Sequence, residues 1–86
     1  MAKYNFEVRT ATHVMLSETV ELVGAEEARI EAARRVGLLL SNHAHEIWSD
    51  EEWRMDVTNE TGLILFVIQI SAMRTAATSG DTWNVR

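Results

Sequence analysis

The chain of 86 residues contains no cysteine, so it forms no disulfide and offers no thiolate to a metal. It has only four glycines, and they lie too far apart to make a glycine-rich phosphate-binding loop. Basic residues are also scarce, because eight lysines and arginines face thirteen aspartates and glutamates, for a formal charge of −5. This balance argues against a dedicated nucleic-acid binder, whose affinity comes largely from neutralising phosphates.

Long hydrophobic runs are absent as well. The longest one covers 63–68, which is far shorter than a membrane span, and the first residues contain no apolar signal-peptide core. We therefore expect a cytoplasmic protein with no membrane partner. The hydrophobic fraction of 47% is ordinary for a globular protein, and the length suits one domain rather than two.

Two segments near the N-terminus alternate between apolar and polar residues, as strands with one buried face do. In Lys3–Arg9 the apolar side is made by Tyr4, Phe6 and Val8. A second, shorter strand is predicted over Thr19–Leu22. The segment between these strands has no consistent period.

A hairpin is predicted further along the chain. Trp53–Thr58 alternates, Asn59–Gly62 provides a tight turn that ends in glycine, and the apolar segment Leu63–Ile70 follows at once. The alternation assigns Ile64, Phe66, Ile68 and Ile70 to the inner face of this last strand. It assigns Leu63, Leu65, Val67 and Gln69 to the outer face, which is apolar too except for the glutamine.

One long helix is predicted from about Gly24 to Glu46. Glu26 and Glu27 lie near its start, where the helix dipole favours negative charge. A broad apolar stripe runs along it, made by Ala25, Ala28, Ala32, Val36, Leu39, Leu40, His43 and Ile47. This stripe is typical of a helix that packs on a sheet, and Leu38 projects away from it.

These elements predict an α+β domain of two layers, in the order β-β-α-β-β. An antiparallel sheet of about four strands would pack against the single helix, and a second copy of the chain would complete it by dimerisation or strand exchange. Residues 1–72 would form this domain, and 73–86, including Trp83, a flexible tail. The expected core is Tyr4, Phe6, Val8, Val20, Leu22, Ala28, Ala32, Val36, Leu39, Leu40, Trp53, Met55, Val57, Ile64, Phe66 and Ile68.

Short motifs along the chain resemble a family of very small alphaproteobacterial proteins classed only as a domain of unknown function. The opening Tyr4–Arg9 is similar to that family's aromatic-x-Phe-acidic-Val-Arg start, and Val20–Leu22 with Glu27–Ala32 to its Val-Glu-Leu and alanine-rich helix entry. Trp53–Val57 and Glu60–Gly62 resemble its Trp-Arg-Phe-x-Val strand and closing glycine. The resemblance covers about Lys3 to Ile70. It implies a small sheet-plus-helix domain and carries over no catalytic or binding residue.

Three departures from the family pattern matter. Thr10-Ala11 stands where the family commonly has Asp-Gly, which puts the turn after the first strand in doubt. The family often has proline where this chain has Val23 or Gln69. It also has polar residues near Leu63 and Val67, so the outer face of the last strand is more apolar here than in relatives.

No constellation of residues indicates catalysis or metal binding. His43 and His45 point about 200° apart on a helix and cannot chelate one ion there. Only a helix that ended before His43 would let the pair bind a metal with Glu46 or Asp50, and the acidic run 49–52 lacks the spacing of a calcium loop. Serine, histidine and aspartate occur in no nucleophile arrangement. We therefore expect no enzyme, no cofactor and no metal site.

The hypothesis we favour is a non-enzymatic protein-interaction module that acts as a homodimer. The outer face or the edge of strand 63–70 would make the contact, through Leu63, Leu65 and Val67, with Leu38 as a further contact residue. Edge pairing, face packing and strand exchange all remain open. The alternative is a regulator that binds a small ligand or anion through the helix arginines Arg29, Arg34 and Arg35.

Overall fold

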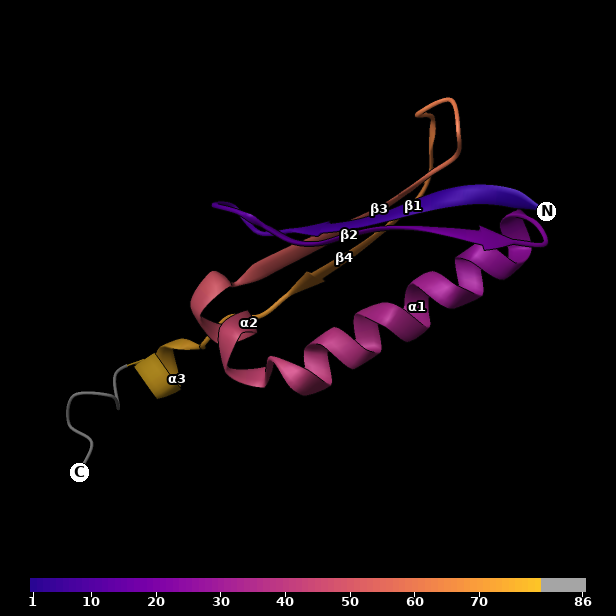
Figure 1. The fold of residues 1–86 in the computed structure, drawn as a ribbon. Helices are drawn as coiled ribbons and strands as arrows, with labels where there is room; N and C mark the ends of the chain where they lie inside the picture. The colour runs from indigo at the N-terminus through magenta and orange to yellow at the C-terminus, as the bar shows by residue number, and fades with distance from the viewer. Residues whose placement is uncertain (80–86) are drawn as a thin grey trace.

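The computed structural model describes residues 1–79 as two layers, with one antiparallel sheet and helices on one of its faces (Figure 1). The strand order in the sheet is β2-β1-β3-β4, so β2 and β4 are the edges. The strands are β1 (Ala2–Arg9), β2 (Val14–Leu22), β3 (Glu52–Thr58) and β4 (Ile64–Ser71), and the helices are α1 (Ala25–Asn42), α2 (Ala44–Asp50) and α3 (Ala76–Ser79). The predicted α+β class and the four strands are therefore confirmed.

The core lies between the two central strands and the helix layer. Its buried apolar residues are Tyr4, Phe6, Val8, Ala28, Ala32, Val36, Ile47, Trp53, Met55 and Val57. The alternation of β1 and β3 places three of them from each strand on the helix side, as the sequence predicts. Ala28 and Ala32 have almost no exposed surface, because their small side chains let α1 lie close to the sheet.

The prediction of a single long helix is wrong in one respect. The helical segment is divided at His43, whose backbone (φ −127°, ψ 43°) leaves the helical region and separates α1 from α2. The amide of His43 still donates to the carbonyl of Leu39, and its own carbonyl accepts from Glu46 as α2 begins. The change of direction lets Ile47 reach the core, where it is 4% exposed.

The first hairpin is longer than predicted, because β2 begins at Val14 rather than near Thr19. Its pairing with β1 runs from Ala2 opposite Leu22 to the turn, with an irregularity beside Val8 and Arg9. In place of the family's Asp-Gly turn, the hydroxyl of Thr10 accepts hydrogen bonds from the amides of Thr12 (3.1 Å) and His13 (3.2 Å). A side-chain oxygen thus holds this turn without a glycine.

The predicted hairpin of β3 and β4 is confirmed, and so is its turn. Gly62 has φ +87°, and the carboxamide oxygen of Asn59 accepts from the amides of Thr61 and Leu63 at 3.0 Å each. Figure 1 shows this turn rising on the side of the sheet away from α1.

A bulge next to the turn changes the expected faces of β4. Thr58 lies opposite Ile64 and Val57 opposite Phe66, so Leu65 is an extra residue between them. Ile64, predicted to be in the core, is 47% exposed, whereas Leu65, predicted to be on the outer face, is partly buried and packs against the core. An extra residue reverses strict alternation, which explains both corrections.

Residues 73–79 follow the sheet and include the short helix α3. The predictions for Trp83 and the rest of 80–86 lie outside the described residues. None of the helices within residues 1–79 is long and apolar enough to cross a membrane.

Candidate interaction surface

The two edges of the sheet differ in charge. β2 carries Glu18 and Glu21, whereas residues 63–72, which contain all of β4, include no charged side chain and no proline. β4 pairs with β3 on one side only, so its other side presents unpaired backbone amide and carbonyl groups. Proteins commonly protect such edges with charges or proline, and β4 has neither.

Apolar side chains of β4 lie along this free edge on both faces of the sheet. On the helix side, Phe66, Ile68 and Ile70 pack against the core but are only partly buried. On the other side, Val67 is 46% exposed. α1 and α2 bury the helix-side residues of β1 and β3 and leave those of β4 incompletely covered.

The structure brings together only part of the predicted interface. Leu63 (61% exposed) and Val67 lie with Ile64 toward the turn end of β4. Leu38 is also exposed, but it follows Arg35 by three residues on α1 and so shares the flank that contacts β2, at the other edge of the sheet. Leu65 packs against the core, as described above.

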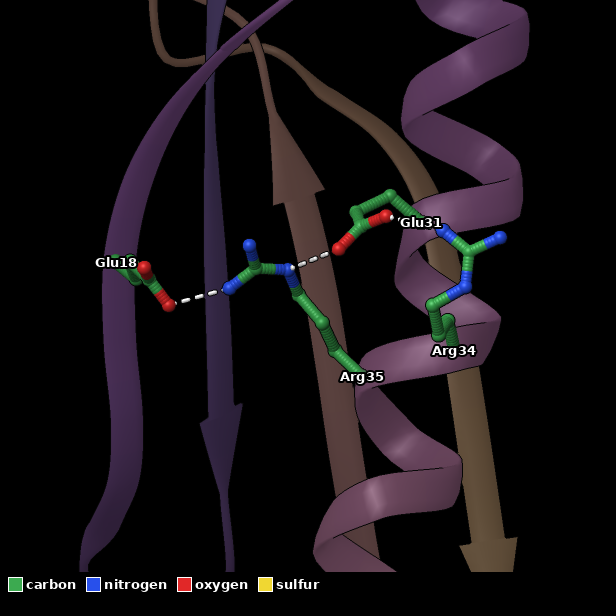
Figure 2. A network of polar contacts seen from close by, with 4 residues as sticks. All are labelled: Glu18, Glu31, Arg34 and Arg35. Carbon is green, nitrogen blue, oxygen red and sulfur yellow. Dashed lines mark hydrogen bonds and ion pairs between the residues drawn. The ribbon is translucent and has the colours of Figure 1, made fainter.

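The arginines of α1 form ion pairs with neighbouring glutamates. Figure 2 shows Arg35 between two elements: its Nε donates to Glu31 of α1 at 2.9 Å, and its Nη1 donates to Glu18 of β2. The same guanidinium lies 5.1 Å from the ring centroid of Phe6. Arg34 donates to Glu31 at 2.7 Å on the solvent side of the helix. These contacts tie α1 to the edge strand β2.

Arg29 pairs with Glu26 in the first turn of α1. The hydrogen bond from Arg29, together with its positive charge, lowers the pKa of Glu26 below its usual value. The same contacts raise the pKa of Arg29. Both side chains are exposed, so water screens the pair and it contributes little to stability.

The histidines do not assemble a metal site. His43 lies at the junction of the two helices, with its Nδ1 3.1 Å from Oε1 of Glu46. Among the described residues, no group of three histidine, aspartate or glutamate side chains is arranged to hold an ion. Nearby, the indole of the buried Trp53 donates to Asp50 at 3.0 Å, which fixes the start of β3 against the end of α2.

The sequence did not predict one arrangement of charged residues on the open face of the sheet. Arg9 of β1 and Arg54 of β3 lie directly opposite each other on the open face of the sheet. The alternation of both segments does point these side chains outward. The sequence contains no signal for the register, however, and only the register places the two arginines side by side.

The fold and the unprotected edge define the class: a small two-layer α+β domain with an open-edged antiparallel sheet. The chain belongs to the family described as Domain of unknown function (DUF6894), whose model matches residues 3–71. This match confirms the predicted membership in an uncharacterised domain family, over nearly the same residues as the short motifs. No curated protein and no solved structure matches the chain.

Proposed function

We propose that this domain is a non-enzymatic, cytoplasmic protein-interaction module that acts as a homodimer through the free edge of β4. The observation that carries the proposal is the lack of any charge or proline over residues 63–72, on a strand that forms the edge of the sheet. An edge of this kind pairs readily with another strand, since each new backbone hydrogen bond satisfies two exposed groups.

A two-fold axis perpendicular to the sheet would join the β4 strands of two copies antiparallel. If the axis passes near Val67, Phe66 of one copy lies beside Ile68 of the other on the helix side. Apolar cross-strand pairs of this kind contribute about 0.2–1 kcal/mol each, in addition to the ladder of backbone hydrogen bonds. Both helix layers would then cover the same face of one eight-stranded sheet, and the partly exposed side chains of β4 would gain a neighbour.

Two other ways of forming the dimer have less support. The open face of the sheet carries the charged residues Lys3, Glu7, Arg9, Arg54 and Asp56, so packing two such faces would desolvate many charges. Strand exchange would open the β3–β4 turn, which the side chain of Asn59 and the positive φ of Gly62 stabilise as a tight connection. Edge pairing requires neither change.

The test is the mass in solution of the natural chain and of two matched variants. Val67→Lys places a charge on the proposed contact, next to its own copy in the dimer, whereas Val14→Lys places the same charge at the start of the other edge strand. Val67 and Val14 have similar exposure, 46% and 52%, so both variants should fold.

By light scattering over a range of concentrations, we expect about twice the chain mass of 9.7 kDa for the natural chain and for Val14→Lys. Val67→Lys should shift to the mass of a monomer. A natural chain that is monomeric at every concentration contradicts the proposal, and so does a dimer that only Val14→Lys disrupts.

The alternative function, a regulator that binds an anion through Arg29, Arg34 and Arg35, has weaker support. Each of these arginines already pairs with a glutamate, so an anion would compete with carboxylates held on the same helix.

A further inference from the structure

The open face of the sheet has charges of the same sign in opposing positions. On two successive outward-facing rungs, Arg9 lies opposite Arg54 and Glu7 lies opposite Asp56. Like charges directly opposite each other destabilise a strand pair, and exchanging the residues of one strand would have removed both repulsions. Each arginine instead pairs along its own strand: Arg9 with Glu7, and Arg54 through Nε with Oδ1 of Asp56 at 2.7 Å. The two guanidinium groups thus lie side by side, and the carboxylates of Glu7 and Asp56 balance their charge.

A hollow of about 240 Å³ adjoins the two arginines on this face. It is lined by Arg9, Thr10, Ala11, Glu52, Arg54 and Gln69. Both guanidinium groups have donors to spare. Within the described residues, Arg54 pairs through Nε alone, so neither of its terminal nitrogens has a protein partner, and Arg9 pairs through Nη2 alone. The hollow is smaller than the pockets that hold drug-sized ligands, and it suits a single small group.

We propose that this hollow binds an oxyanion group, held between the guanidinium groups of Arg9 and Arg54. Guanidinium groups match the oxygens of phosphates and carboxylates in geometry and charge. An anion between the two arginines would accept from the guanidinium nitrogens that have no protein partner within the described residues. A phosphate monoester carries about −1.5 to −2 charges near pH 7 and a carboxylate only one, so the site prefers phosphate.

The negative charge of Glu52 opposes anion binding, so one substitution at this site should strengthen binding and another should weaken it. Its carboxylate lines the hollow and accepts a hydrogen bond from Nε2 of Gln69. Removing this negative charge should therefore strengthen anion binding, whereas removing the positive charge of Arg54 should weaken it. Glu52 and Arg54 are exposed, so neither substitution disturbs the core.

The experiment titrates the full chain with inorganic phosphate, and separately with acetate, at constant ionic strength. Amide and arginine Nε–H signals are followed by ¹H–¹⁵N NMR. We expect saturable shifts at Arg9, Thr10, Ala11 and Arg54, with phosphate binding more tightly than acetate. Arg54→Gln should weaken phosphate binding by about tenfold, the usual scale for losing a hydrogen-bonded charge. Glu52→Gln should strengthen it by a few-fold.

The matched control is Arg29→Gln, which removes the same charge from the exposed surface of α1. This variant should bind phosphate like the natural chain. The proposal is overturned if phosphate produces no saturable shift in this region, if acetate binds as tightly as phosphate, or if Arg29→Gln weakens binding as much as Arg54→Gln. It is also overturned if Glu52→Gln weakens binding. The mass measurements on β4 have a separate readout, so the dimer and the anion site succeed or fail independently.

Discussion

Arg35 should stabilise the fold far more than its neighbour Arg34, although both are arginines of α1 that bond to Glu31. Only Arg35 reaches the sheet, where it pairs with Glu18 and lies over the ring of Phe6; its side chain is 21% exposed, against 64% for Arg34. A partly exposed ion pair contributes about 0.2–1 kcal/mol, and a cation–π contact about 0.5–1 kcal/mol. The stem of Arg35 adds packing that alanine removes.

We therefore expect Arg35→Ala to lower the free energy of unfolding by about 1–3 kcal/mol, and Arg34→Ala by no more than about 0.5 kcal/mol. Urea denaturation at one fixed protein concentration measures both values, since self-association would make the stability concentration-dependent. A double-mutant cycle with Glu18→Gln isolates the contact between α1 and β2. Equal losses for the two arginines, or no coupling between Arg35 and Glu18, would refute the bridge between helix and edge strand.

Three backbone positions lead to further predictions, each measured by the same denaturation. Gly37→Ala should stabilise the chain by up to about 1 kcal/mol, because Gly37 lies inside α1 and its added Cβ would meet nothing within 4 Å. Gly62→Ala should instead destabilise the chain by about 1–2 kcal/mol, because φ at Gly62 is +87°. Stabilisation by both alanines would contradict the assigned turn. Glu51 has φ 70° at the end of α2, so Glu51→Gly should raise stability by up to about 1 kcal/mol; a loss would mean that its side chain contributes more than the strain costs.

The pattern of residues was sufficient to predict most of the elements. β1 and β3 alternate strictly, the alanines of α1 mark its buried side, and Asn59 and Gly62 mark a turn. These features depend on a residue's immediate neighbours, and they were confirmed. The division of the helix at His43 was missed because an apolar stripe of nearly constant period continues through it to Ile47.

Positions that depend on pairing between strands were not predictable in the same way. One extra residue beside the turn exposes Ile64 and buries Leu65 in part, although both are equally apolar in the sequence. Leu38 was grouped with the outer residues of β4 because all are apolar and off the core stripe, yet it lies on the flank of α1 that faces β2. The sequence identifies exposed apolar residues but contains no measure of the distance between them.

The 86 residues alone therefore determine the α+β class, the principal strands and helix, and an unusually apolar segment at 63–70, because these depend on local periodicity and composition. The order β2-β1-β3-β4 and the register of β1 against β3 arise only when distant segments pair. That pairing makes the apolar segment an unprotected edge rather than a central strand. It also brings Arg9 and Arg54, 45 positions apart in the chain, to opposite places on one face of the sheet.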